Sequence, residues 1–207
     1  DSDLVIQVRA VDKAGNELIS SYTLRIDQDT DKPKVLVTAP IAGSVVSNAV
    51  ITLSGSVTDD DGVEQAGSIQ YRLSADGGAT WDPDWTAVPA NKIGGDSTLR
   101  LINSHTFTSI IDGTKLLQVR AVDIYGAMSD TTAVTFTQDT GAPELSGLPD
   151  TSAPRNGDFS VSGTATDTNG TVKAVRYRVL KNGGQIIGWT NATLDDEEVS
   201  TTGFSTG

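Results

Sequence analysis

The hexapeptide QVRAVD occurs twice in the chain, at residues 7–12 and at residues 118–123. The surrounding residues match as well. DSDLVIQVRAVDKAGNELISSYTLRIDQDTDKP, starting at Asp1, aligns with DGTKLLQVRAVDIYGAMSDTTAVTFTQDTGAP, starting at Asp112, with one single-residue gap. Because self-similarity at a fixed spacing is typical of repeat architectures, we expect repeats of about 110 residues.

A second pair of matches follows the proline that ends each of these segments. VITLSGSVTDDDG from Val50 aligns with DFSVSGTATDTNG from Asp158, and IQYRLSADGG from Ile69 aligns with VRYRVLKNGG from Val175. The matches predict three parts. Residues 1–29 are the C-terminal strands of one repeat, residues 30–139 are a complete repeat, and residues 140–207 are the N-terminal part of a further repeat.

Apolar and polar residues alternate within these segments, which is typical of strands with one buried face. The expected buried positions are Ile51, Leu53, Gly55 and Val57, the aligned Phe159, Val161, Gly163 and Ala165, and Ile69, Tyr71, Leu73, Val119, Ala121, Val134 and Phe136. No stretch shows the period of an amphipathic helix. The sequence therefore predicts an all-β protein whose repeats have about seven short strands, as in an immunoglobulin-like sandwich.

The chain resembles the bacterial Ig-like repeats of cell-surface proteins. The resemblance rests on the strand and turn VRAVDKAGN at residues 8–16 and on the linkers DTDKP at residues 29–33 and DTGAP at residues 139–143. It covers nearly the whole chain and implies tandem β-sandwiches, one complete and two partial, at an extracellular location. The second copy of the turn differs, because Ala127 stands where the first copy has Asn16.

Charge and composition narrow the function classes. The formal net charge is −12, which argues against nucleic acid or anionic lipid as a partner, since both require a basic surface. The chain has no cysteine and therefore neither a disulfide nor a thiolate metal site. No apolar run is long enough for a transmembrane helix.

Acidic residues gather where the topology of a sandwich brings three connections to one end: the incoming linker, the loop after the second strand and the turn after the sixth. For the complete repeat these connections hold Asp29, Asp31, Asp59, Asp60, Asp61 and Asp123. A hard divalent cation such as Ca²⁺ takes six to eight oxygen ligands and would relieve their repulsion. At the next junction only Asp139 and Asp167 remain, because Gly141 replaces Asp31. The alternative is a set of solvated acidic loops.

One motif resembles a structural hairpin of glycan-active enzymes. The stretch SADGGATW at residues 74–81 fits the Asp-box pattern of sialidases and other β-propellers, through Ser74, Asp76, Gly78, Thr80 and Trp81. Its chemistry is structural: Asp76 is expected to accept bonds from turn amides, Gly78 to take a positive φ, and Trp81 to pack beneath the turn. We expect this stretch to stabilise a hairpin, with contact to a glycan as the alternative.

Catalytic patterns lack support in the sequence. The single histidine, His105, is expected in a strand near Phe107, without a cysteine or a nucleophile-elbow sequence elsewhere. The paired glycines are expected to be turns rather than phosphate-binding loops. The predicted function is a non-catalytic spacer or scaffold in a repetitive extracellular surface protein or fibre, such as an adhesin, surface layer or filament. The alternative is a carbohydrate-binding or accessory region of a secreted glycan-active enzyme.

The first residues continue the repeat at the point where the last residues stop, because Asp1 aligns with Asp112 and Phe204 with Phe107. Two accounts fit this relationship. In the first, the chain is a window on a longer array, with neighbouring repeats as its partners. In the second, residues 1–29 of one subunit complete the last repeat of another by strand addition, which produces a head-to-tail fibre. Asp12 of that neighbour would then join Asp139 and Asp167.

Overall fold

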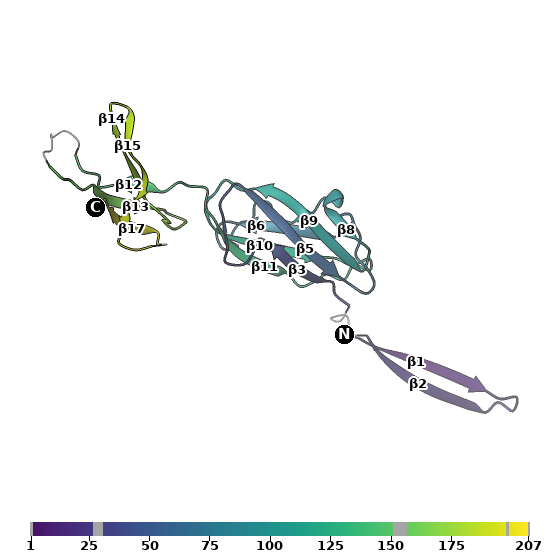
Figure 1. Cartoon of the computed structure of the whole chain (residues 1–207). Helices are drawn as coiled ribbons and strands as arrows, with labels where there is room; N and C mark the ends of the chain where they lie inside the picture. Colours follow the sequence, from purple (N-terminus) through teal and green to yellow (C-terminus); the bar gives the residue numbers. More distant parts are fainter. Residues whose placement is uncertain (1, 27–30, 151–156, 198, 207) are drawn as a thin grey trace. The chain divides into compact units, whose positions relative to one another are not determined.

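The computed structural model describes residues 2–26, 31–150, 157–197 and 199–206, and the described residues form an all-β protein, as predicted (Figure 1). They contain no α-helix, and the one helical element among them is the short 3₁₀ turn Ala90–Lys92. The strands fall into three groups, described in turn below: an N-terminal hairpin, a central sandwich and a C-terminal set of sheets.

The N-terminal hairpin consists of β1 (Ser2–Val11) and β2 (Glu17–Ile26), which pair antiparallel along their full length. In this register Leu4 lies opposite Leu24 and Ile6 opposite Tyr22, so one face of the ribbon is apolar. The turn is closed by the bond from the Asp12 amide to the Asn16 carbonyl, 2.9 Å long, and by Gly15 at a φ of 89°.

The central sandwich consists of two sheets over residues 34–138. The first sheet has the order β3-β5-β9-β8, formed by β3 (Lys34–Ala39), β5 (Val50–Thr58), β8 (Ile93–Gly95) and β9 (Leu99–Thr108). The second has the order β4-β11-β10-β6-β7, formed by β4 (Val45–Val46), β6 (Ile69–Ser74), β7 (Thr86–Ala87), β10 (Gly113–Ala121) and β11 (Thr132–Gln138).

Burial along these strands follows the predicted alternation. Ile69, Tyr71 and Leu73 of β6 are at most 5% exposed, whereas the intervening Gln70 and Arg72 are half-buried. Seven of the other expected core positions of this sandwich are also buried, namely Ile51, Leu53, Val57, Val119, Ala121, Val134 and Phe136, whereas Gly55 is half-buried. At about 25 cal/mol per Å² of apolar surface, these side chains supply most of the driving force for folding.

The C-terminal sheets lie within residues 144–205. One sheet has the order β12-β13-β17-β16, formed by β12 (Glu144–Ser146), β13 (Ser162–Thr166), β16 (Thr193–Leu194) and β17 (Thr201–Ser205). The other is the hairpin of β14 (Arg176–Lys181) and β15 (Gly184–Asn191). The buried cluster is small and contains Ala165, Val172, Val175 and Phe204.

One part of the predicted alternation is wrong in this region. Phe159 and Val161 were expected inside a strand with Gly163 and Ala165, but β13 begins only at Ser162 and Phe159 is 60% exposed. Alternation predicts a buried face only where other strands cover that face. Among the described strands, none covers Phe159 as the central sandwich covers the aligned Ile51, which is 0% exposed.

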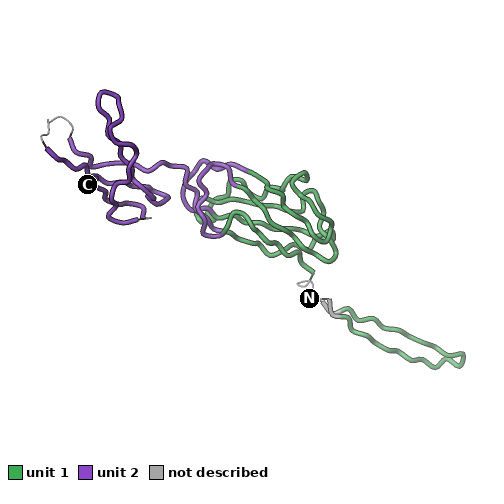
Figure 2. Tube along the Cα trace, in the orientation of Figure 1, with its two compact units in different colours: residues 1–41, 52–106, 116–134 green, residues 42–51, 107–115, 135–207 purple. Residues whose placement is uncertain are grey.

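The chain divides into two compact units (Figure 2). One comprises residues 1–41, 52–106 and 116–134, and it contains the N-terminal hairpin and most of the central sandwich. The other comprises residues 42–51, 107–115 and 135–207, and it contains the C-terminal sheets.

Candidate functional site

The loop after β5 and the turn after β10 meet at one end of the central sandwich, as the sequence predicted for its acidic residues. Val63 and Asp123 form an isolated antiparallel bridge, and the amide of Ile124 donates to the carbonyl of Gly62 at 3.0 Å. These backbone contacts bring the loop that carries Asp59 and Asp61 beside the turn that starts at Asp123.

Asp123 is the most buried of these carboxylates, with 5% of its surface exposed. Its Oδ1 accepts from the amides of Tyr125 and Ala127, each at 2.8 Å. Its Oδ2 is buried and has no hydrogen-bond partner among the described residues. One oxygen thus fixes the turn, while the other has lost its water without gaining a donor, a free-energy cost.

In the corresponding turn of the N-terminal hairpin, both carboxylate oxygens of the aspartate have hydrogen-bond donors. Oδ1 of Asp12 accepts from the amides of Ala14 and Asn16, and its Oδ2 accepts from the side-chain amide of Asn16 at 2.8 Å. These bonds, the side-chain bond from Asn16 above all, hold the pKa of Asp12 below its ordinary value. Ala127 takes the position of Asn16 in the central sandwich, so the second oxygen of Asp123 lacks that partner.

Asp59 shows the same division between its two oxygens. Its Oδ1 accepts from the amides of Gly62 at 2.7 Å and Asp61 at 3.1 Å, whereas its Oδ2 is buried without a hydrogen-bond partner in the described part of the chain. The two adjacent connections therefore each present one buried carboxylate oxygen with an unused lone pair. Oxygens of this kind are the ligands that hard cations prefer.

Asp31 and Asp61 add further negative charge at this end. Desolvation, the charge of Asp31 and a hydrogen bond between the two side chains raise the pKa of Asp61, and Asp60 and Asp59 contribute to the same shift. Repulsion among the neighbouring carboxylates thus adds to the effect of desolvation on Asp61. A bound cation would offset the part of this shift that comes from carboxylate repulsion.

The structure does not assemble these residues into a finished metal site. In the described ranges no three His, Cys, Asp or Glu side chains converge closely enough to hold an ion. Asp29, expected to be a further ligand, lies outside the described residues. Asp59 and Asp60 also line a hollow of about 370 Å³ with Lys32 and Lys34, which supply an alternative counter-charge.

At the second junction the two expected carboxylates lie together. Asp167 is 8% exposed, and its Oδ1 accepts from the Gly170 amide at 2.8 Å. A Cβ on Gly170 would overlap Oδ2 of Asp139 and approach Oδ1 of Asp167 to 2.9 Å. Asp112, which was not expected here, binds the amide and hydroxyl of Thr140 beside them. The only sequence feature that could have indicated Asp112 at this site was its position directly before a strand.

The residues of the SADGGATW stretch form one tight turn. Ser74 is 1% exposed, and its hydroxyl donates to Oδ1 of Asp76 at 2.7 Å. The Oγ of Ser74 in turn accepts from the Gly78 amide at 2.8 Å. Asp76 also accepts from the Thr80 amide at 2.8 Å and from the Thr80 hydroxyl at 2.5 Å. Gly78 has a φ of 101°, and a Cβ at this position would lie 3.4 Å from the ring of Trp81. All of these contacts are internal to the turn or its supporting strand.

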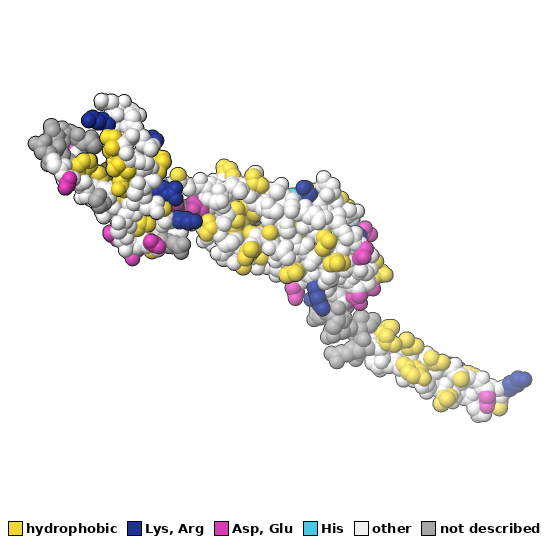
Figure 3. Space-filling model, in the orientation of Figure 1, with side chains coloured by type: hydrophobic (Ala, Val, Ile, Leu, Met, Phe, Trp, Pro, Cys, Tyr) yellow, Lys and Arg dark blue, Asp and Glu magenta, His cyan; other side chains and the backbone are white. Residues whose placement is uncertain are grey.

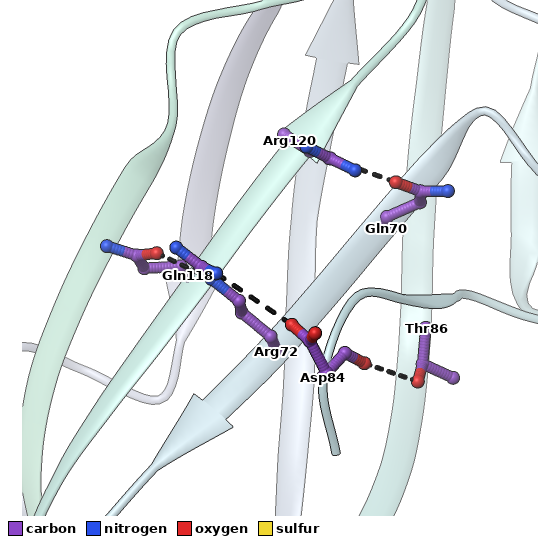
Figure 4. A network of polar contacts seen from close by, with 6 residues as sticks. All are labelled: Gln70, Arg72, Asp84, Thr86, Gln118 and Arg120. Carbon is purple, nitrogen blue, oxygen red and sulfur yellow. Dashed lines mark hydrogen bonds and ion pairs between the residues drawn. The ribbon is translucent and has the colours of Figure 1, made fainter. Parts of the chain in front are cut away.

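A polar network on the outer face of β6 and β10 was not predicted. Arg72 lies opposite Gln118 and its Nε donates to the Gln118 side chain at 2.8 Å, and Arg120 lies opposite Gln70 and donates to it at 2.9 Å (Figure 4). An ion pair of 3.8 Å joins Arg72 to Asp84. Two Arg–Gln pairs, one in each direction across the strands, thus tie the two strands together in one register.

The same arginines cover the tryptophans that follow β6. The Arg72 guanidinium carbon lies 3.7 Å from the ring centre of Trp81 and 4.4 Å from that of Trp85, and that of Arg120 lies 4.0 Å from the ring centre of Trp85. Such contacts are worth about 0.5–2 kcal/mol each. We call Trp81, Arg72, Trp85 and Arg120 the Arg–Trp ladder. The recurring Tyr-Arg pairs, Tyr71-Arg72 and Tyr177-Arg178, were the available sequence signal.

The C-terminal sheets contain a shorter version of the ladder. Tyr71 pairs with Thr86 and Tyr177 with Thr190, and in each copy a tryptophan precedes that threonine. These strand pairs place Trp189 at the position that corresponds to Trp85. Arg178 lies 4.9 Å from the Trp189 ring centre, and Trp189 remains 63% exposed.

His105 occupies a core position of β9. It is 8% exposed and its ring meets Tyr71 edge-on, with 5.0 Å between ring centres. Burial, followed by the charge of Lys92, lowers its pKa. An imidazole kept neutral in this way acts as a packing residue.

Comparison of the chain with protein-family models and with curated proteins finds no match. No helix in the described residues has the length and hydrophobicity needed to span a bilayer.

Proposed function

We propose that this chain is a non-catalytic spacer from a repetitive extracellular surface protein or fibre of the adhesin, surface-layer or filament type, built from tandem Ig-like repeats. The observation that carries the proposal is that the features shared by the copies are those that build a sheet. A Cβ on Gly55 would overlap the carbonyl oxygen of Leu36, and a Cβ on the aligned Gly163 would lie 2.7 Å from that of Ser146. Both glycines allow the same close strand approach.

The side chains that stand out chemically also support a structural role. Ser74 and Asp76 are used within their own turn, and Arg72 and Arg120 bind glutamines on the paired strand. The neighbouring repeats of the same array are the expected partners of such a chain, and repeats that contact only their neighbours are typical of extended proteins.

We further propose that Ca²⁺ binds at the end of the central sandwich and stiffens the junction. The observation in favour is the pair of buried carboxylate oxygens, Oδ2 of Asp59 and Oδ2 of Asp123, that have no donor among the described residues. Asp29, Asp31 and Asp61 are the further ligands we assign, and Asp139 and Asp167 form the corresponding pair at the second junction. A cation shared between linker and sandwich would restrict bending of the linker.

The alternative function, glycan binding, depends on open aromatic faces. Trp85 has an arginine 4.4 Å and another 4.0 Å from its ring centre, and Trp81 carries Arg72, so these rings are less available to a sugar. Trp189 is the exposed ring that favours the alternative. Binding of the chain to an insoluble polysaccharide, lost on Trp189→Ala, would support glycan recognition instead of a spacer.

Single-molecule stretching tests the spacer proposal directly. A load-bearing repeat of about 110 residues should unfold in one event that lengthens the chain by roughly 350 Å. Refolding between pulls should restore the event. Hydrolysis of a glycan or peptide substrate by the purified chain would refute a non-catalytic role. A central sandwich that yields without a resolved force peak would refute a load-bearing one.

A further inference from the structure

An apolar groove lies along the C-terminal sheets. It has a volume of about 990 Å³, and its lining includes Phe159, Val161, Tyr177, Val179, Leu180 and Ile187. Phe159 is 60% exposed and Ile187 41%. Figure 3 shows apolar side chains gathered on this part of the molecule. Exposed apolar surface of this kind marks a place where another element docks.

The central sandwich identifies that element. The residues aligned with Phe159, Val161, Tyr177 and Val179 are Ile51, Leu53, Tyr71 and Leu73, and none of these four is more than 5% exposed. There β6 pairs with β10 over six residue pairs, from Leu116 opposite Ser74 to Ala121 opposite Ile69. Among the described strands β14, the counterpart of β6, pairs with β15 alone.

The N-terminal hairpin carries the counterpart of β10. In β10 the inward residues Leu117 and Val119 are 0% exposed, whereas the aligned Ile6 and Val8 of β1 are 44% and 55% exposed. Leu4 and Leu24, on the same face, are each 52% exposed. An isolated two-stranded hairpin is marginally stable in water, so this face needs a partner.

We propose that the groove beside β14 accepts the N-terminal hairpin of a second copy of this chain, so that copies join head to tail by strand addition. This inference names the partner for the proposed structural function and rests on it. The pairing of β10 with β6, transferred to the aligned residues, places Ile6 opposite Val179, Val8 opposite Tyr177 and Ala10 opposite Val175. Each inward side chain then enters the groove that its counterpart fills in the central sandwich.

The same transferred pairing also predicts which residues meet on the outer face of the proposed strand pair between β1 and β14. Gln7 lies opposite Arg178, as Gln118 lies opposite Arg72, and it can accept the same guanidinium bond. Arg9 takes the position of Arg120 and covers the exposed ring of Trp189. One pair differs: Arg9 lies opposite Arg176, where the central sandwich has Arg120 opposite Gln70. Like charges in directly opposed positions weaken a strand pair.

Each copy would offer one hairpin and one groove, which are different surfaces. Such a heterologous contact produces open chains rather than closed dimers when its rotation does not close a ring. Sedimentation velocity of the full chain should therefore show species that grow with protein concentration.

Two blocked variants test which surfaces meet. Val8→Lys places a charge on the apolar face of the hairpin, and Val179→Lys places one in the groove. Each variant alone should raise the concentration for half-assembly by about tenfold or more. An equimolar mixture of the two should instead form a complex limited to two chains. In that complex Val8→Lys supplies only a groove and Val179→Lys supplies only a hairpin. Thr23→Lys, on the opposite face of the hairpin, is the matched control and should assemble like the unmodified chain.

A third variant should strengthen the joint. Arg176→Gln restores the Arg–Gln pair of the central sandwich, so we expect half-assembly at a concentration about two- to fivefold lower. Lys173→Gln makes the same change of charge at an exposed position and should have no effect.

A chain that stays monomeric over its whole soluble range, or mixed blocked variants that fail to combine, would overturn the proposal. Such a result would leave the spacer function intact, because stretching of the central sandwich reports on that function independently.

Discussion

Asn16 donates its side-chain amide to Oδ2 of Asp12 at 2.8 Å, and the central sandwich has no counterpart of this bond because Ala127 takes the place of Asn16. The backbone of the two turns is otherwise held alike, through two amides on Oδ1 of Asp12 and two on Oδ1 of Asp123. The difference confines the unsatisfied carboxylate oxygen to the central sandwich, where Asp59 presents a second one.

The first prediction is that calcium stabilises the chain. A ligand that binds only the folded state adds about 1.4 kcal/mol at a tenfold excess over its Kd and about 2.7 kcal/mol at a hundredfold excess. Differential scanning calorimetry should show a higher Tm with calcium, reversed by EDTA. Asp123→Asn and Asp29→Asn should each abolish the shift. If calorimetric titration at millimolar calcium detects no binding, these carboxylates do not form a calcium site, and Lys32 and Lys34 supply the counter-charge instead.

The second prediction introduces the asparagine of the N-terminal turn into the corresponding turn of the central sandwich. Ala127→Asn should supply the missing donor to Oδ2 of Asp123, which raises the free energy of unfolding without calcium by about 1 kcal/mol and reduces the calcium-induced rise in Tm. Urea denaturation with and without calcium measures both effects. Ala127→Ser, too short to reproduce the bond, serves as the control. Equal calcium responses in the Asn variant and the unmodified chain would show that Oδ2 of Asp123 is not a ligand.

The core of the central sandwich could be predicted from the sequence. Alternation of apolar and polar residues indicates the buried face of a strand correctly where a second sheet covers that face. Ile69, Tyr71 and Leu73 lie where the alternation placed them. The same rule failed at Phe159, since a pattern of side chains does not state whether another strand covers them. The aligned residues of the central sandwich supply this missing information, because their structure shows which strand covers each position.

The acidic end was predictable in place but not in geometry. The topology brought the loop of Asp59 beside Asp123, yet the division of each carboxylate into one bonded and one free oxygen depends on turn amides that no residue pattern specifies. The Arg–Trp ladder was missed for a related reason. Arg72 and Trp85 are 13 positions apart, and only the pairing of β6 with β7 makes them neighbours.

The third prediction concerns this ladder. Trp85→Ala removes a ring that contacts both Arg72 and Arg120, so we expect a loss of about 1–3 kcal/mol in the free energy of unfolding. Arg72→Lys should cost more than a conservative exchange usually does, because an ammonium group cannot cover two rings and bind Gln118 at once. Chemical denaturation of single and double variants gives the coupling energy. Strict additivity of Arg72→Ala and Trp85→Ala would show that the contact contributes nothing.

The fourth prediction is a loss of stability in weak acid through His105. Because burial lowers its folded-state pKa, the unfolded chain takes up the proton first as the pH falls below 6.5. The contribution of His105 is therefore fully present above pH 6.5 and is lost as the pH falls through its folded-state value. His105→Phe keeps an edge-on ring against Tyr71 and should flatten the Tm profile below pH 6.5. An unchanged profile would place the acid sensitivity on the carboxylates instead.

The fifth prediction replaces a buried amine with the residue at the aligned position of the N-terminal hairpin. Lys115 is 0% exposed and its Nζ has no hydrogen-bond partner among the described residues, whereas Leu4 stands at the aligned position. Lys115→Leu should raise the free energy of unfolding at pH 7 by about 1–3 kcal/mol, because a buried polar group without a partner is removed. Urea denaturation of the two proteins at a series of pH values measures the difference.

The sign of the pH dependence distinguishes this cause from better packing alone. Desolvation lowers the folded-state pKa of Lys115 below its ordinary value of 10.5, against a smaller opposing effect of Asp112. Between the folded-state pKa and 10.5 the unfolded chain holds more protons, so the stability of the unmodified chain rises with pH in that window. The advantage of Lys115→Leu should therefore be largest near neutral pH and shrink as the pH approaches 10.5. A difference that stays constant from pH 7 to 10.5 would mean that packing, and not the buried charge, is what the leucine improves.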